Sequence, residues 1–157
     1  MKTILVPVDF SDVTGSIIKA VKMFAKTMKS RVVLLHVRNG DSLITNTAAE
    51  QIPMTPISFA SDGIIVQSET STEVQKQLDK LKSRFAEMPF EVATRQKIDG
   101  LPVELILQTC KEEAADLIII GSHGHGAVYN LLVGSVTAGV LKSAKCPVLV
   151  VPSPRPG

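Results

Sequence analysis

The sequence has 157 residues, of which 45% are hydrophobic, and its formal net charge is +2. This length suits one domain with a single core, and so weak a positive balance disfavours the phosphate backbone of a nucleic acid as the partner. Aromatic residues make up only 4% and there is no Trp, so a surface for stacking bases is also disfavoured.

The first element is the apolar, β-branched run at residues 4–8, which predicts a strand buried on both faces. The run contains Pro7 and is followed by Asp9, so it is too short for the core of a signal peptide. No segment of the sequence reaches the ~20 apolar residues of a membrane-spanning helix, and we therefore expect a cytoplasmic protein without membrane contact.

A helix follows, with Ser11 as the candidate N-cap and apolar residues at helical spacing from Ile17 to Met28. Residues 31–37, RVVLLHV, predict a second buried strand. Two strands joined through a helix favour a parallel pair with a right-handed crossover.

Residues 39–70 interrupt this alternation. They contain four acidic residues and no Lys or Arg, and Pro53 and Pro56 prevent a long helix. Because long segments without periodicity are usually lids, partner surfaces or disordered, we expect a long, mobile connection here.

The second half of the sequence resumes the alternation. Apolar residues at helical spacing predict a helix over residues 71–85, and residues 90–98 alternate like a strand near a sheet edge. Pro102 suits the first turn of the next helix. The remaining elements that we expect are a strand at 116–120, a helix at 134–144, a strand at 147–151 and a disordered tail at 153–157.

Strands that alternate with helices predict one α/β domain over residues 1–152, with a mostly parallel sheet and helices on both faces. Ligands of such sheets bind beyond the carboxyl ends of the strands, where the strand order reverses. The loops to search therefore begin at Asp9, after Val37 and after Gly121.

The glycine-rich stretch GSHGHGAVYNLLVGSVT, residues 121–137, follows one strand and opens the last helix. Gly124, after the strand, and Gly134, before the helix, expose backbone that no side chain covers. The helix N-terminus, which begins beside Ser135, favours phosphate. Since no Lys or Arg lies between Lys111 and Lys142, we expect backbone N–H groups and hydroxyls to hold a polyphosphate.

Other candidate residues leave alternatives open. Asp9 could accept hydrogen bonds from a ribose or an adenine, hold Mg²⁺, or cap the first helix. His123 and His125 lack a third ligand nearby in the sequence, which favours a position near phosphates over a metal pair. We interpret His36 as a satisfied core residue. Cys110 and Cys146 fit no zinc pattern and are interpreted as buried free thiols.

Five segments, ILVPVDFSD, VVLLHV, ADLIIIGSHG, LLVGSVT and CPVLVVP, together resemble the universal stress protein family, single-domain type. The most specific part of the resemblance is the ATP-binding pattern G-x2-G-x9-G-[ST]. Gly121, Gly124, Gly134 and Ser135 satisfy this pattern in full. The resemblance implies a Rossmann-like, three-layer sandwich with a five-stranded parallel sheet in the order 3-2-1-4-5.

The resemblance also implies a site for ATP, or for AMP or ADP, with Mg²⁺ or Mn²⁺ held mainly by the phosphates and no metal site of the protein's own. Many relatives have Arg or Lys in place of His125 and Ser or Thr in place of Gly126, so a shorter nucleotide is an alternative. The residues expected to line adenosine are Pro7, Val8, Asp9 and Val37, and those expected around ribose and phosphates are Gly121, Ser122, His123, Gly124, His125, Gly126, Ala127, Gly134, Ser135, Val136 and Thr137.

Members of the family also form dimers, commonly through the last strand, here residues 147–151. The resemblance therefore implies a homodimeric, ATP-binding stress-response regulator that acts on a protein partner. Two alternatives are a slow ATPase or adenylate-transferring enzyme at the same site, and a dimeric scaffold without nucleotide. No general base, nucleophile or fixed cation is apparent in the nucleotide loops beyond Asp9 and the histidines, which disfavours the enzyme.

Overall fold

A computed structural model describes residues 2–38, 70–123 and 133–153 of the chain. The predicted connection, apart from Thr70, and the tail after Ser153 lie outside these ranges. The elements in chain order are β1 (Thr3–Pro7), α1 (Thr14–Met28), β2 (Arg31–Val37), α2 (Ser71–Ser83), β3 (Val92–Lys97), α3 (Pro102–Glu112), β4 (Leu117–Gly121), α4 (Ser135–Ser143) and β5 (Val148–Val151).

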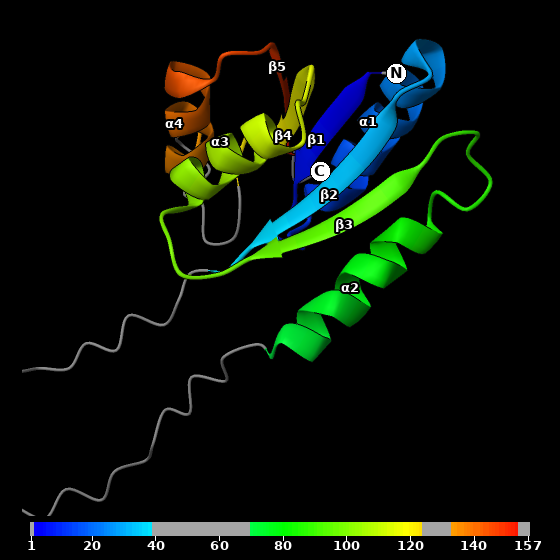
Figure 1. The fold of residues 1–157 in the computed structure, drawn as a ribbon, viewed down its shortest axis with the longest axis horizontal. Helices are drawn as coiled ribbons and strands as arrows, with labels where there is room; N and C mark the ends of the chain where they lie inside the picture. The colour runs from blue at the N-terminus through cyan, green and yellow to red at the C-terminus, as the bar shows by residue number, and fades with distance from the viewer. Residues whose placement is uncertain (1, 39–69, 124–132, 154–157) are drawn as a thin grey trace, which may run out of the picture.

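The five strands form one parallel sheet in the order β3-β2-β1-β4-β5, which is the order that the family resemblance implies (Figure 1). The chain adds β2 and β3 on one side of β1 and then crosses to add β4 and β5 on the other side. The strand order therefore reverses between β1 and β4, which is where ligands of open α/β sheets bind.

Alternate residues of each central strand supply the two cores of the domain. On β1, Ile4 and Val6 face α1 and α2, whereas Leu5 faces α3 and α4. All three side chains are fully buried. Because both faces of the sheet are covered by helices, its central strands are apolar throughout, as is typical of parallel sheets.

The first helix starts later than the sequence predicts. Ser11 is not its N-cap, because α1 begins at Thr14 after Val13, and no side-chain hydrogen bond caps it. Instead, the carbonyl oxygen of Ser11 accepts a hydrogen bond from the backbone N–H of Thr14 at 3.0 Å. The chain thus turns once more before the helix begins.

The second helix has a complete capping box at its start. The backbone N–H of Thr70 donates to the carboxylate of Glu73 at 2.8 Å, and the Thr70 hydroxyl oxygen accepts from the backbone N–H of Glu73 at 3.3 Å. Each residue thereby satisfies a backbone N–H group that the helix leaves unpaired.

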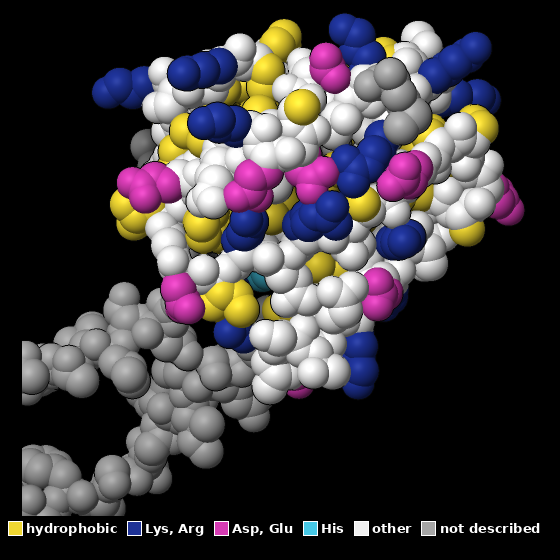
Figure 2. Space-filling model, viewed as in Figure 1, with side chains coloured by type: hydrophobic (Ala, Val, Ile, Leu, Met, Phe, Trp, Pro, Cys, Tyr) yellow, Lys and Arg dark blue, Asp and Glu magenta, His cyan; other side chains and the backbone are white. Residues whose placement is uncertain are grey.

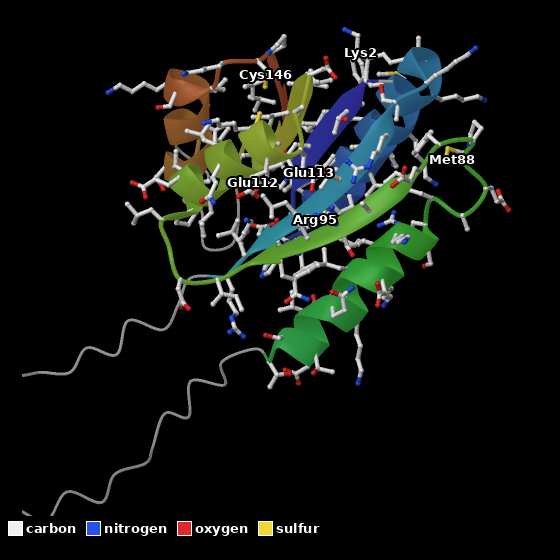
Figure 3. All side chains as sticks on the ribbon, viewed as in Figure 1. Lys2, Met88, Arg95, Glu112, Glu113 and Cys146 are labelled. Carbon is white, nitrogen blue, oxygen red and sulfur yellow. The ribbon has the colours of Figure 1, made fainter. Side chains whose placement is uncertain are left out.

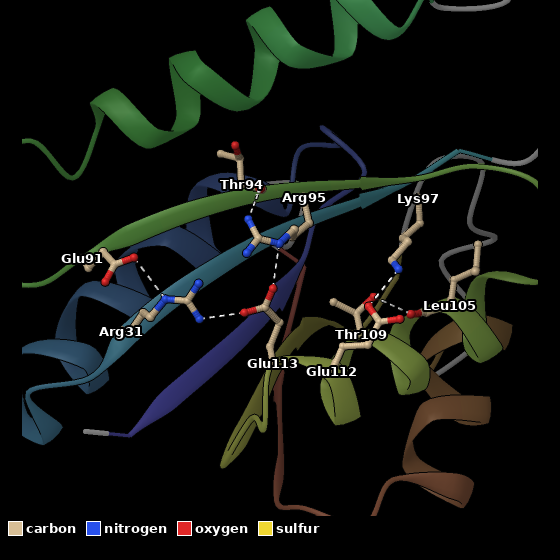
Figure 4. A network of polar contacts seen from close by, with 9 residues as sticks. All are labelled: Arg31, Glu91, Thr94, Arg95, Lys97, Leu105, Thr109, Glu112 and Glu113. Carbon is tan, nitrogen blue, oxygen red and sulfur yellow. Dashed lines mark hydrogen bonds and ion pairs between the residues drawn. The ribbon is translucent and has the colours of Figure 1, made fainter.

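A polar network ties the edge of the sheet to the end of α3 (Figure 4). Glu113 accepts hydrogen bonds from Arg31 and from Arg95, both at 2.7 Å. Arg31 also donates to Glu91 at 3.2 Å, and Lys97 pairs with Glu112 at 2.8 Å. These contacts link β2, β3 and α3, whose sequence positions are far apart.

Charged side chains of both signs lie beside one another across the middle of the face seen in Figure 2. Among the described residues, no helix is long and apolar enough to cross a lipid bilayer.

Candidate functional site

The candidate site lies at the carboxyl ends of β1 and β4, on either side of the point where the strand order reverses. Two loops meet there. One leads from β1 into α1, and the other leaves β4 at Gly121 and returns at Gly134, the residue before α4.

The first loop is held against the end of β2 by its backbone. The N–H of Val8 donates to the carbonyl oxygen of Leu35 at 2.8 Å, which extends the β1–β2 pairing by one step. Asp9 Oδ1 accepts hydrogen bonds from the N–H and the hydroxyl of Ser11, at 3.0 and 2.6 Å. Since α1 begins at Thr14, Asp9 shapes the turn before the helix and is not the helix cap.

Phe10 is the residue of this loop that the sequence analysis missed. Its φ is 60°, in the left-handed region that non-glycine residues rarely occupy. Its ring stacks on the imidazole of His36, with centroids 4.6 Å apart and planes inclined by 25°. Nothing in the amino-acid pattern signals a left-handed Phe, because bulky residues disfavour that conformation.

His36 is a satisfied core residue, as predicted. Its side chain is buried, and Nδ1 lies 2.9 Å from the carbonyl oxygen of Val8. A carbonyl oxygen can only accept a hydrogen bond, so Nδ1 carries a proton. The imidazole therefore fixes the first loop twice, by this hydrogen bond and by its stack on Phe10.

Gly121, the last residue of β4, is a glycine for reasons of packing. A Cβ atom at this position would lie 2.8 Å from Cγ1 of Val13 and 3.3 Å from Cδ1 of Ile17. Val13 directly precedes α1, and Ile17 lies in its first turn. The absence of a side chain at Gly121 thus lets the two loops of the site approach each other.

Gly134 stands in a different environment. Its φ of −70° and ψ of 160° are open to any residue, and an added Cβ would meet the carbonyl oxygen of Ser122 only at the ordinary distance of 3.4 Å. Neither backbone conformation nor packing among the described residues requires a glycine here. Gly134 is also the N-cap of α4, and no side-chain hydrogen bond caps this helix.

Hydrogen bonds join the end of β4 at Gly121 and Ser122 directly to the start of α4 at Gly134 and Thr137. The N–H of Gly134 donates to the carbonyl oxygen of Ser122 at 2.7 Å, and the buried hydroxyl of Thr137 donates to the carbonyl oxygen of Gly121 at 2.7 Å. The Thr137 proton is thus used within the protein. Ser135, in contrast, is exposed at the first position of α4.

Ser122 connects the site to the last strand. Its N–H donates to the carbonyl oxygen of Val151 at 2.8 Å, and its hydroxyl oxygen accepts from the N–H of Ser153 at 3.1 Å. The hydroxyl also lies 3.1 Å from Nδ1 of His123. These contacts hold the beginning of the glycine-rich loop in place.

Some of the remaining predicted residues are described by the structure, and others lie outside the described ranges. Pro7 ends β1, whereas Val37 and Val136 are half-buried against the core on the α3–α4 face. No group of three or more His, Cys, Asp and Glu side chains in the described ranges could hold a metal ion. Four predicted residues lie outside the described residues: Gly124, His125, Gly126 and Ala127.

Comparisons with known proteins agree on one family. The model of the Universal stress protein family matches residues 1–152. Universal stress protein MJ0577 of Methanocaldococcus jannaschii is 31% identical over 158 residues, which cover 96% of this chain and 94% of the relative. Universal stress protein YxiE of Bacillus subtilis is 29% identical over 147 residues, which cover 94% and 96%.

Solved structures show the same fold. The structure of MJ0577 is 27% identical and aligns over 99% of this chain and 98% of its own, with a TM-score of 0.75. Universal stress protein UspA from Lactobacillus plantarum is 20% identical and aligns over 96% and 97%, with a TM-score of 0.69.

Proposed function

Since this chain belongs to the universal stress protein family, we propose that it binds an adenine nucleotide between the first loop and the glycine elements of β4 and α4. We propose further that it acts in the cytoplasm as a homodimeric, nucleotide-dependent regulator of a stress response. Two structural neighbours support the choice of ligand. They are universal stress proteins in complex with dAMP and with cAMP, with TM-scores of 0.65 and 0.64 and identities of 17% and 19%.

The observation that carries the proposal is the environment of Gly134. Among the described residues, neither backbone conformation nor packing requires a glycine at this position. A ligand that lies directly against the backbone would require one, because any side chain would occupy its place. The N-terminus of α4, which no described side chain caps, offers N–H groups and the positive end of the helix dipole, both of which attract phosphate.

The positions of the side chains indicate which part of the nucleotide each of them would contact. The exposed hydroxyl of Ser135 and the first N–H groups of α4 would hold the phosphates. The backbone at Val8 and the carboxylate of Asp9 would line the adenosine, and Val37 would contact the adenine. A divalent cation, Mg²⁺ or Mn²⁺, would be held mainly by phosphate oxygens and would screen their charge.

Small molecules released from the purified protein on denaturation should contain an adenine nucleotide by mass spectrometry. Calorimetric titration of ATP, ADP and AMP with Mg²⁺ should then show which nucleotide binds best. We expect Gly134→Ala to weaken binding about tenfold or more, because a new Cβ displaces the phosphate from the backbone.

The matched control is Gly15→Ala, since a Cβ added at Gly15 in α1 has no other atom within 4 Å. This variant should bind nucleotide like the wild type. Circular dichroism should show that both variants are folded. If a folded Gly134→Ala protein binds nucleotide with unchanged affinity, α4 does not hold the phosphates and the proposed site is wrong.

A further inference from the structure

The two cysteines of the chain lie side by side although they are 36 residues apart. Cys110 is near the end of α3, and Cys146 is in the segment between α4 and β5. Their sulfur atoms are 3.5 Å apart, and both thiols are free. Figure 3 shows Cys146 beside the chain that leads into β5.

The pair is far from the proposed nucleotide site. It lies at the amino end of β5, whereas the site lies at the carboxyl ends of the strands. The cysteine pair and the nucleotide site lie toward opposite ends of helix α4, whose nine residues span about 13 Å at 1.5 Å per residue. The thiols are therefore not explained by nucleotide binding.

Both thiols sit at the rim of the core on the α3–α4 face. Each is half-buried, and the neighbouring apolar side chains include Ala115, Ala144 and Val148. Neither residue is fully buried, whereas structural cysteines that are fully buried are inert. The surroundings thus favour chemistry at this pair over simple packing.

We propose that Cys110 and Cys146 form a reversible intrachain disulfide that clamps α3 to the entrance of β5. A disulfide bond is about 2.05 Å long, so the sulfur atoms must approach each other by roughly 1.5 Å. Cys146 lies outside the helices and strands, in a segment that can supply such a shift without disturbing a hydrogen-bonded ladder.

The oxidant is a low-molecular-weight disulfide such as glutathione disulfide. The Cys146 thiolate attacks one sulfur of the oxidant, forms a mixed disulfide and releases one small thiol. Cys110 then attacks the Cys146 sulfur as it loses its proton, the bond between Cys146 and the small thiol breaks, and the leaving thiolate takes up a proton and departs as the second small thiol. In total the protein loses two protons and two electrons, which together are two hydrogen atoms, and the oxidant gains them as two thiols.

The order of attack follows from the surroundings of Cys110. Burial, together with its hydrogen bond to Cys146, raises the pKa of the Cys110 thiol to about 12. Cys110 therefore stays protonated near neutral pH and is the poorer first nucleophile. Once Cys146 carries the mixed disulfide, its sulfur lies close to Cys110, and proximity favours the second step.

The clamp would act on the edge of the sheet. Strand β5 pairs with β4 alone in this chain's sheet and is only four residues long. A covalent link to α3 encloses the segment between residues 110 and 146, which includes β4 and α4. Linking residues so far apart restricts the unfolded chain and stabilises the folded one.

The test treats the reduced, full-length protein with glutathione disulfide. The mass of the intact protein should fall by two hydrogen atoms and return with dithiothreitol. A tryptic map without reduction should join the fragment that ends at Lys111 to the fragment that follows Lys145. The thermal midpoint of the oxidised protein should rise by roughly 5–15 °C.

Two serine variants serve as controls. Cys110→Ser should accumulate a stable mixed disulfide at Cys146, whereas Cys146→Ser should react slowly or not at all. The tryptic map of the wild type needs neither variant, so it stands even if one of them fails to fold. The proposal is overturned if the wild type stays reduced, keeps bound glutathione or links two chains, or if the oxidised protein melts no higher than the reduced one.

Discussion

Phe10 and His36 hold each other at the carboxyl ends of β1 and β2, with ring centroids 4.6 Å apart. Phe10 adopts a φ of 60° to make this stack, and left-handed backbone costs a non-glycine residue about 1–2 kcal/mol. A strained residue of this kind persists only where its surroundings compensate. The stack and the hydrogen bond from His36 to Val8 supply that compensation.

The strain at Phe10 can be measured with two substitutions. Phe10→Gly and Phe10→Ala both remove the ring, but only glycine also removes the left-handed penalty. We expect the glycine variant to be more stable than the alanine variant by about 1 kcal/mol in urea unfolding. Equal stability of the two variants would mean that the loop relaxes when the ring is lost.

A side chain at Gly121 should destabilise the fold. The Cβ of Gly121→Ala would lie 2.8 Å from Cγ1 of Val13, so α1 or β4 must shift. We expect a loss of about 1–3 kcal/mol in the free energy of unfolding. Gly15→Ala is the control, and it should stabilise α1 by about 0.5–1 kcal/mol. The packing argument fails if Gly121→Ala unfolds at the wild-type urea concentration.

Substitutions at Ser135 and Thr137 should affect different properties, with Ser135 contributing to nucleotide binding and Thr137 to stability. The exposed Ser135 hydroxyl is available to a ligand, so Ser135→Ala should reduce nucleotide affinity about 3- to 10-fold and leave stability unchanged. Thr137→Val removes the donor to the Gly121 carbonyl oxygen and should cost about 1–2 kcal/mol of stability. Calorimetric titration measures nucleotide affinity and urea unfolding measures stability for both variants. If Thr137→Val weakened only binding and Ser135→Ala only stability, the roles assigned to the two hydroxyls would be wrong.

Glu113 should make stability depend on pH. Its hydrogen bonds from Arg31 and then from Arg95 lower its pKa below the ordinary value of 4.5. This contribution to stability is fully present above pH 4.5 and is lost as the pH falls through the lowered value. We expect Glu113→Gln to cost about 1–2 kcal/mol at pH 7 and progressively less in acid.

The matched control for Glu113 is Glu112→Gln. Glu112 pairs with Lys97 on the surface, with 44% of its side chain exposed, so its removal should change unfolding little. Urea unfolding from pH 7 to pH 3 gives the comparison. A constant difference between Glu113→Gln and the wild type over this range would contradict the linkage.

The proposed dimer can be tested at one residue of β5. The carbonyl oxygen of Pro147 accepts from Ile118 in β4, and that of Val151 accepts from Ser122 directly after β4. Every second residue of β5 therefore directs its backbone groups toward that strand. Val148 and Val150 therefore direct their backbone groups toward the open edge. Val150→Pro removes one outward N–H group, and prolines are tolerated at such edge positions. Sedimentation should show monomers.

The comparison with Leu149→Pro sharpens this test. Leu149 pairs with Ile119 of β4, so a proline there breaks the sheet itself and should lower stability. Val150→Pro should lower the dimer fraction while circular dichroism stays unchanged. A folded Val150→Pro protein that remains fully dimeric would place the interface elsewhere.

The sequence predicts the fold well because its strands and helices alternate and each has its own period. The strand order, which the family resemblance implies, is confirmed. The apolar face of α2 is confirmed too, with Val74, Leu78 and Leu81 buried as expected. Element ends shift by one or two residues, since hydrogen-bond ladders rather than composition decide them. The N-cap at Ser11 is wrong because the chain turns once more before α1.

The site is less predictable than the fold. The spacing of the glycines locates the loops. It does not distinguish Gly121, which packing requires, from Gly134, which packing among the described residues does not require. The left-handed Phe10 contradicts its intrinsic preference, so no local rule anticipates it. Cys110 and Cys146 are free thiols as predicted, but they are half-buried and not buried. Their proximity depends on how α3 packs beside the segment before β5.

The capping box at Thr70 and Glu73 has a consequence for how this chain can change in length. Four consecutive residues specify where α2 begins, and the signal is independent of the sequence before them. An insertion or deletion upstream therefore leaves the helix in register with β2 and β3. Doubling the length of a loop costs only about 0.6 kcal/mol in closure entropy. The stretch between β2 and α2 is thus a place where evolution, or a protein engineer, can add a recognition module without rebuilding the domain.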